Sequence, residues 1–489
     1  MRMLPATLAL GVWLAAAALS APAHLRAQEP ITLTQAIALA QERSHQASAA
    51  RAARDAARYR HGAFRSRLLP QLSLGGTVPD YNRSIIPVLQ PDGSTLFQPQ
   101  QQTTGTFTMT LSQKLPLTGG DLFVSSSLAR LSVSGQQRFE SWSSTPVAVG
   151  LRQDILRPNE AAWDRRQDAA QAELAERQYV EAVEGVALQV TNAFFDVYAA
   201  RVALDNAITN AAVNDTLYRL NTGRFGVGKI GENDLLQSEL ALLRSRTVLE
   251  AARLEQDRAV AALRLALNVP VGTPLEVAVS GEVPQVEVDT ARAVAEALHN
   301  RAALADVVLQ DVVARRSVAE AKLATGVGAS VQASFGLNAT APAASLVYQN
   351  LLEARRFTLS VQLPLWQWGA REQGVQAAQA DRERVRSLSQ ATVEQTAYEA
   401  LFAALNLMQA RRTLALVTKA DSVAGKRFEV AYNRYVIGRI TLDNLYIAQT
   451  EKDQAVLQFV QALRGYWVAH YRLRLATLFD FTTGQSIRL

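Results

Sequence analysis

The residue types that catalyse reactions or bind metals are few in this sequence and lie far apart. The chain of 489 residues has no cysteine, so it offers neither a thiol nucleophile nor a disulfide. Its five histidines lack metal-ligand spacing and have no carboxylate cluster beside them: His24, His45, His61, His299 and His470. Phosphate-binding glycine loops, a nucleophile elbow and paired catalytic carboxylates are also missing. We therefore expect no catalytic residue, no metal site, no cofactor and no enzyme activity.

The charge of the chain does not favour a nucleic-acid partner. The formal net charge is +6, and it falls to +4 if the two arginines of the N-terminal segment, Arg2 and Arg26, are removed. The remaining charge is spread along the chain, and the basic run between Arg51 and Arg67 has the spacing of a solvated helix flank. We therefore expect no nucleic-acid binding.

The N-terminal 27 residues have the pattern of a secretory signal peptide. A short basic start is followed by an apolar core from Leu8 to Leu19 and by small residues at Ala21, Ala23 and Ala27. An uncleaved anchor is the alternative. No later segment reaches the ~18 consecutive apolar residues that a membrane-spanning helix needs. If the mature protein crosses a membrane, we expect it to do so with strands.

Similar segments recur along the chain at nearly constant offsets. Residues 224–230 (RFGVGKI) resemble residues 434–440 (RYVIGRI) at an offset of 210. Residues 149–156 parallel 358–365 at an offset of 209, and residues 40–43 parallel 298–301 at an offset of 258. This pattern indicates an internal duplication. The first half would then hold 49 additional residues, which is 258 minus 209.

Proline placement predicts very long helices. There are 111 residues without proline between Pro158 and Pro270, and 125 more after Pro364. The segment 159–223 would form a helix of about 100 Å at ~1.5 Å per residue. In the last helix a coiled-coil seam is predicted from steps of three and four: Leu445, Ala448, Lys452, Ala455, Phe459, Ala462, Tyr466, Ala469 and Leu473. A matching seam in the first half would begin with Leu236, Leu240 and Leu243.

Several segments alternate between apolar and small polar residues, as strands do. They lie at residues 71–78, 106–111, 147–155, 327–338 and 357–365. Their lengths approach the ~9–11 residues of a transmembrane strand. A soluble antiparallel sheet gives the same alternation, but the signal peptide and the lack of a spanning helix favour a barrel. The segments 79–104 and 338–356 are expected to be loops.

Together these features predict a mixed α+β fold, internally duplicated, with long antiparallel helical hairpins and a β-barrel. The expected segments are a signal peptide (1–27), an N-terminal helix (28–68), strands (69–157) with an extra hairpin at 106–133, a helical hairpin (158–268) with its tip near 224–231, a linker (269–290), a helix (291–325), strands (326–366), a helical hairpin (367–480) with its tip near 434–441, and a tail (481–489).

The order of these elements, repeated after a signal peptide, resembles the TolC family of outer-membrane efflux proteins over nearly the whole mature chain. Residues 33–40 (LTQAIALA) and 68–74 (LLPQLSL) are similar to the start of the family's first helix and to its first strand. Residues 362–365 (QLPL), followed by Gly369, are similar to its strand-to-helix junction. The resemblance implies a homotrimer in the outer membrane, with one barrel in lipid and a helical tunnel that extends into the periplasm.

The resemblance also implies a function and partners. The chain would be the exit duct of a tripartite efflux or secretion system, and would receive substrates from an inner-membrane pump through a periplasmic adaptor protein. The two tips would contact the adaptor through Arg224, Phe225, Gly228, Arg434, Tyr435 and Gly438. A glycine there also has a structural reason of its own, because a tight interhelical turn requires positive φ.

In the resembling family, acidic residues six positions beyond the tip glycine can form a ring at a narrow periplasmic entrance. Here that position is Asp234 in the first half and Asn444 in the second. Asp443 precedes Asn444 and lies about 100° around the helix. One acidic ring, from Asp234, is therefore expected. The alternative role for Asp234 is stabilisation of the first helical turn through the helix dipole.

Three alternatives stay open at the level of sequence. The additional residues of the first half predict six strands per protomer against the family's usual four, so a trimer would form an eighteen-stranded barrel, unless the extra hairpin lies outside it. The channel could serve one secreted protein or metal export in place of drug-like molecules. Outside transport, a periplasmic coiled-coil rod without a pore would share the long helices but has no need of the strands.

Overall fold

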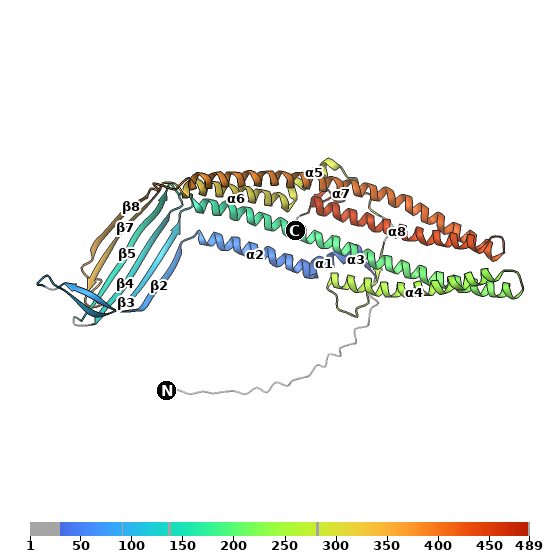
Figure 1. The fold of residues 1–489 in the computed structure, drawn as a ribbon, viewed down its shortest axis with the longest axis horizontal. Helices are drawn as coiled ribbons and strands as arrows, with labels where there is room; N and C mark the ends of the chain where they lie inside the picture. The colour runs from blue at the N-terminus through green and yellow to red at the C-terminus, as the bar shows by residue number, and fades with distance from the viewer. Residues whose placement is uncertain (1–29, 90, 135–137, 280–282, 488–489) are drawn as a thin grey trace, which may run out of the picture. The chain divides into compact units, whose positions relative to one another are not determined.

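The computed structural model describes residues 30–89, 91–134, 138–279 and 283–487 (Figure 1). The predicted signal peptide, residues 1–27, lies outside the described residues. The chain forms two compact units. One consists of the described part of Met1–Leu39 together with Ala193–Val283, and the other of Ala40–Asn192 together with Pro284–Leu489. The units therefore do not coincide with the two halves of the sequence.

The helices of the two halves have equal lengths. Helices α1 (Leu33–Arg43) and α5 (Thr290–Asn300) have 11 residues each, and α2 (His45–Arg67) and α6 (Ala302–Ala324) have 23 each. Helices α3 (Glu160–Gly226) and α7 (Ala370–Val436) have 67 residues each, and α4 (Glu232–Leu267) and α8 (Leu442–Thr477) have 36 each.

The helix boundaries also correct the offsets expected from the sequence. The short helices of the two halves start 257 residues apart and the long helices 210 residues apart. The segment between α2 and α3 is therefore 47 residues longer than that between α6 and α7, instead of 49. The match of residues 40–43 with 298–301 was wrong by one residue, because neighbouring alanine-rich registers of a helix look alike.

The single helices expected over 28–68 and 291–325 are each two helices. Ser44 has extended backbone angles and caps α2, because its side chain accepts a hydrogen bond from the amide of Ala47 at 3.1 Å. Arg301 is likewise extended and separates α5 from α6. Neither break contains a proline or a glycine, so the positions of the prolines did not predict these two helix boundaries.

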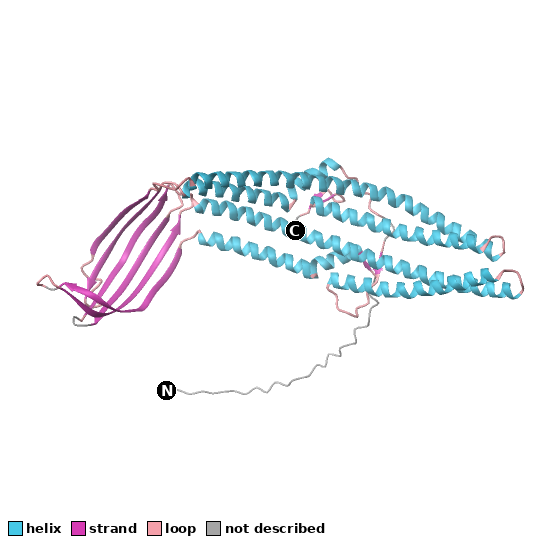
Figure 2. Ribbon diagram, in the orientation of Figure 1, coloured by secondary structure: helices cyan, strands magenta, loops and turns pink. Residues whose placement is uncertain are grey.

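One antiparallel sheet contains the six long strands in the order β2-β3-β4-β5-β7-β8 (Figures 1 and 2). These strands are β2 (Gln71–Leu89), β3 (Thr95–Lys114), β4 (Asp121–Ser134), β5 (Phe139–Ile155), β7 (Gly328–Ala341) and β8 (Leu352–Gln362). The whole sheet lies in the second unit, and β2 and β8 are its edges. Two small pairs complete the described strands: β1 (Ile31–Thr32) with β6 (Val277–Ala278), and β9 (Phe479–Asp480) with β10 (Gln485–Ser486).

The strands are longer than the sequence indicated. The loop expected at 79–104 is mostly strand, and the loop expected at 338–356 is shortened to the residues between Ala341 and Leu352. Strands β2 and β3 pair up to Leu89 opposite Thr95. The prolines that suggested a loop are tolerated in the sheet. Pro79 lies at a register shift on the edge strand β2. Pro99 precedes Gln101, the first residue of β3 that pairs with β4, so at Pro99 only β2 pairs with β3. A missing amide donor costs little at such places.

The seam predicted for α8 is buried at five of its nine positions, and the seam predicted for α4 was misplaced. Five seam positions of α8 are buried: Leu445, Ala448, Ala455, Tyr466 and Leu473. In α4, Leu236, Leu240 and Leu243 are about half exposed, at 55%, 47% and 53%. The buried positions there include Ser238 and Ser245, whose hydroxyls donate to main-chain carbonyls three residues earlier at 2.7 and 2.8 Å. A serine that satisfies its own hydroxyl occupies the seam, which an apolar pattern does not predict.

Hydropathy sets one further limit on the helices. Within the described ranges, no helix combines the length and the apolar composition that crossing a lipid bilayer requires.

Candidate functional site

The first predicted tip is a tight turn between α3 and α4. The amide of Gly228 donates to the carbonyl of Phe225 and the amide of Lys229 to the carbonyl of Arg224, both at 2.9 Å. Gly228 has φ of +69°. This is the Schellman arrangement, in which a left-handed residue satisfies the last free carbonyls of a helix.

The second tip, between α7 and α8, has the same backbone pattern. The amide of Gly438 donates to the carbonyl of Tyr435 and the amide of Arg439 to the carbonyl of Arg434, again at 2.9 Å. Gly438 has φ of +73°. A Cβ atom at either glycine would meet nothing within 4 Å, so backbone angle and not space requires glycine here. The expected positive φ at both glycines is confirmed.

The side chains of the two tips differ. Tyr435 is buried at 4% exposure, whereas its counterpart Phe225 is 42% exposed. The hydroxyl of Tyr446 is buried and has no hydrogen-bond partner among the described residues. Burial, and then the neighbouring Tyr435, raise the pKa of Tyr446 to about 12. The counterpart of Tyr446 in the first tip is Leu236, 210 residues earlier. The two tips therefore have the same backbone turn but different side chains.

The predicted entrance residues lie in the first turns of α4 and α8. Asp234 and Asn444 are each the third residue of their helix, as their spacing from the tip glycines required. Asp234 is half-buried, while Asp443 and Asn444 are exposed. Asn444 donates from Nδ2 to Oγ1 of Thr441 at 3.0 Å. A carboxylate at these positions also interacts favourably with the helix dipole, so both roles of Asp234 remain predictions.

One face of the six-stranded sheet is apolar and exposed. A row of paired residues crosses five strands, from Leu72 through Leu111, Val124 and Val149 to Phe335. Exposed apolar residues on this face include Leu72, Leu74, Phe107, Met109, Leu111, Val147, Val149, Phe335, Phe357, Leu359 and Val361. An apolar face of this extent is far larger than the exposed patches of ordinary soluble monomers. Among the described residues, these side chains are left exposed.

The opposite face of the sheet is built of small polar residues. Ser73, Thr110 and Ser125 lie in one row, and Gly75, Thr108 and Ser127 in the next. Phe123 is a large exception, which lies against the bare backbone of Gly150, where a Cβ atom would come within 2.3 Å of its ring. In soluble antiparallel sheets the polar face meets water and the apolar face is covered by the protein itself. Here the described residues do not cover the apolar face.

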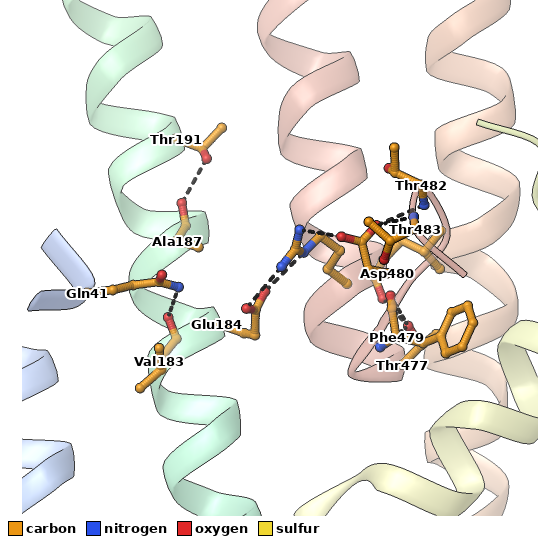
Figure 3. A network of polar contacts seen from close by, with 12 residues as sticks. Gln41, Val183, Glu184, Ala187, Thr191, Thr477, Phe479, Asp480, Thr482 and Thr483 are labelled. Carbon is orange, nitrogen blue, oxygen red and sulfur yellow. Dashed lines mark hydrogen bonds and ion pairs between the residues drawn. The ribbon is translucent and has the colours of Figure 1, made fainter. Parts of the chain in front are cut away.

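A buried ion network, which the sequence analysis did not find, joins distant parts of the second unit (Figure 3). Glu184 of α3 is 2% exposed and pairs with Arg474 of α8, with N–O distances of 3.2 and 3.3 Å. Arg474 also pairs with Asp480 at 3.0 Å, and Asp480 accepts from the amide of Thr482. Burial alone would lower the pKa of Arg474, but Glu184 and Asp480 raise it above its ordinary value.

His470 lies one turn before Arg474 and is also buried. Burial lowers its pKa to about 4, the charge of Arg474 acts in the same direction, and Asp480 opposes it. The imidazole is therefore neutral at pH 7. The sequence did hold one signal for the network, since Glu184 is a single acid among the buried Val183, Val186 and Ala187. Its partner Arg474 is 290 residues away, and no local pattern gives that distance.

The described residues gather no set of three His, Asp or Glu side chains that could hold a metal ion. The candidate functional features are therefore the two tips and, separately, the two-faced sheet.

The comparisons with known proteins rest on structure. No protein-family profile matches the chain, and no curated protein sequence does. The Campylobacter jejuni CmeC outer membrane channel is similar with a TM-score of 0.67 and 16% identity, over 94% of this chain and 87% of that one. The outer membrane protein VceC of Vibrio cholerae is similar with a TM-score of 0.66 and 13% identity, over 92% and 96%.

A third similar structure is the open state of the Neisseria gonorrhoeae MtrE outer membrane channel, with a TM-score of 0.63 and 13% identity, over 93% of this chain and 89% of that one. These alignments cover nearly the whole length of both partners, so the likeness concerns the complete fold. The chain therefore has the fold of the TolC-like outer-membrane channels, as the sequence resemblance predicted.

Proposed function

We propose that the chain is the outer-membrane exit duct of a tripartite efflux or secretion system. It would carry substrates from an inner-membrane pump and a periplasmic adaptor across the periplasm and the outer membrane. The observation that carries this proposal is the sheet, which exposes an apolar face and has a face of small polar residues behind it. In a closed barrel, lipid would cover the first face and water the second.

A barrel would require more than one copy of the chain. Strands β2 and β8 are unpaired edges in a single copy, and unpaired backbone groups are costly in lipid. Two of the similar structures are described as outer membrane channels, and a channel wall in lipid cannot have open strand edges. We take the assembly to be a homotrimer, as the resemblance implies, with outer-membrane lipid around its barrel.

The long helices would form the periplasmic part of the duct. Each 67-residue helix would be about 100 Å long at ~1.5 Å per residue, which is more than a compact domain needs. The equal helix lengths of the two halves support an internal duplication, in which α7 and α8 repeat α3 and α4.

The tips would be the contacts for the adaptor. The residues proposed for this contact are Arg224, Phe225, Gly228, Arg434, Tyr435 and Gly438. Three copies of Asp234 would form an acidic ring at the entrance, because Asn444 at the equivalent place is neutral and Asp443 points to another side of its helix. Such a ring would attract cations and repel anions.

Two experiments test this function. Membrane fractionation of cells that make the full chain should place it with the outer membrane, whereas recovery in the soluble periplasmic fraction would favour the coiled-coil rod. Second, Gly438→Trp should leave assembly and insertion intact and abolish export, because it places a large side chain at an adaptor contact. Gly374→Trp is the control, since Gly374 is exposed in α7, the helix that precedes this tip, with nothing within 4 Å of an added Cβ atom. Normal export by the Gly438 variant would argue against docking at the tip.

A further inference from the structure

We infer that each copy of the chain contributes six strands to the pore wall, so that a trimer closes an eighteen-stranded barrel. This inference rests on the proposed function. The second half has two strands, β7 and β8, between its short and long helices, and a plain duplicate would place two in the first half as well. The first half has four, because the 47 additional residues form most of β3 and β4.

The additional hairpin is part of the sheet and not an attachment to it. Strand β3 pairs with β2 from Ser112 opposite Gln71 to Thr95 opposite Leu89. Strand β4 pairs with β5 from Asp121 opposite Arg152 onward. Strands β2 and β5 are therefore not neighbours, and a hairpin outside the barrel would require both of these ladders to break.

The hairpin also continues both faces of the sheet. Met109, Leu111 and Val124 extend the apolar face, and Thr108 and Ser125 extend the polar one. A hairpin surrounded by lipid would place its hydroxyl side chains in hydrocarbon, and one surrounded by water would expose its apolar row. A position in the barrel wall satisfies both faces at once.

Strand direction allows identical copies to join at the edges. Every neighbouring pair in the sheet is antiparallel, and the number of strands is even, so β2 and β8 run in opposite directions. The edge β2 of one copy can then pair antiparallel with β8 of the next, without a parallel seam. Three copies of six strands each give the eighteen strands.

The extra strands change the width of the pore. Barrel diameter grows roughly linearly with strand number, so eighteen strands give a diameter about one and a half times that of twelve, or ~36 Å against ~24 Å between backbones. Barrels of about 16–18 strands leave an aqueous channel where small barrels are filled by side chains. With Thr108, Ser125 and Ser334 on its inner face, this exit would be water-filled and would pass hydrophilic solutes. Selection by size would then lie in the helical tunnel.

Cysteine labelling of the full chain tests the position of the hairpin directly, since the native sequence has no cysteine. Thr108→Cys and Ser125→Cys probe the polar face of the hairpin, and Met109→Cys and Val124→Cys its apolar face. In β7, Ser334→Cys and Phe335→Cys provide the matched reference for the two faces. The probes are a membrane-impermeant maleimide and a quencher attached to lipid tails, applied to the protein in lipid vesicles.

The expected result is complete maleimide labelling at Thr108 and Ser125, as at Ser334, and little labelling at Met109 and Val124, as at Phe335. When a fluorophore is attached before the protein enters vesicles, the lipid-tail quencher should quench it at Met109, Val124 and Phe335 only. Alternation in β7 but equal labelling of both hairpin faces would overturn the eighteen-stranded barrel and leave the proposed function standing. Absence of alternation in β7 as well would contradict the barrel itself, and with it the proposed function.

Deletion of residues 95–134 tests the width. The last residue of β2 and the first residue of β5 lie at the same end of the strands, so the new connection between them is short. Leu72 would then face Val149, and both already lie on the apolar face. Electron cryo-microscopy along the barrel axis should show a diameter smaller by about a third than that of the full chain. An unchanged diameter would refute the inference. If the shortened chain does not fold, the strands are counted in the barrel of the full chain by the same method. Eighteen strands would support the inference, and twelve would refute it.

Discussion

His470 should make the stability of the helical part sensitive to mild acid. Its side chain is 6% exposed, and its pKa is lowered from 6.5 to about 4, chiefly by burial and then by Arg474. At pH 7 the imidazole is neutral in both the folded and the unfolded chain. As the pH falls through 6.5, the unfolded chain takes up a proton that the folded chain does not bind, so the free energy of unfolding decreases until the pH reaches about 4.

The lowered pKa gives the size of this effect. Each pKa unit corresponds to ~1.4 kcal/mol, so the loss of stability is about 2 kcal/mol at pH 5 and about 3 kcal/mol once the pH is below both values. Chemical denaturation of the purified protein at pH 7.5 and pH 5 measures it. His470→Gln should lose about 2 kcal/mol less than the parent chain between these two pH values. His45→Gln, at an exposed position, should behave as the parent chain does. An equal loss in the parent and the His470 variant would show that His470 is not the source of the acid sensitivity.

Three further predictions concern the described packing. Arg474→Met should lower the free energy of unfolding by about 3–5 kcal/mol because it leaves Glu184 buried without its partner, and adding Glu184→Leu should restore most of that loss. Arg253→Met, which breaks an exposed pair with Glu250, should lower it by less than ~1 kcal/mol. Equal effects of the two arginine variants on the denaturation midpoint would contradict the buried network. Gly438→Ala and Gly228→Ala should each destabilise the fold by about 1–2 kcal/mol because both glycines have positive φ, whereas Gly374→Ala inside a helix should stabilise it by ~0.5–1 kcal/mol. If thermal unfolding showed a stability change of the same sign for all three variants, the tip geometry would be contradicted. Tyr446→Phe should be neutral or stabilise by up to ~2 kcal/mol, since it removes a buried hydroxyl without a partner among the described residues, and clear destabilisation in the same assay would contradict that environment.

Features set by neighbouring residues could be predicted from the sequence. The positive φ of Gly228 and Gly438 follows from a helix end within a few residues, and the turn after Leu115 follows from Thr118, Gly119 and Gly120, which join two alternating runs. The extra hairpin was therefore predicted, although β3 starts at Thr95 and not at residue 106.

Features set by distant neighbours could not be predicted in the same way. Whether Pro79 and Pro99 interrupt a strand depends on how many partners the strand has at that point, which only the sheet order reveals. The seam of α4 was misplaced because two buried serines occupy it while Leu236 and Leu240 face outward. For the candidate site, the positions of Asp234 and Asn444 in their helices could be predicted from their spacing to the tip glycines, but Glu184 and Arg474 meet only in the folded chain.

Electron microscopy of the protein extracted from outer membranes in detergent tests whether copies of this chain close into one conduit. We expect threefold particles with a detergent belt around a barrel and a hollow helical rod of about 100 Å, the length expected of 67 helical residues. Solid rods, or monomers without a belt, would contradict this expectation and would favour a coiled-coil spacer without a pore.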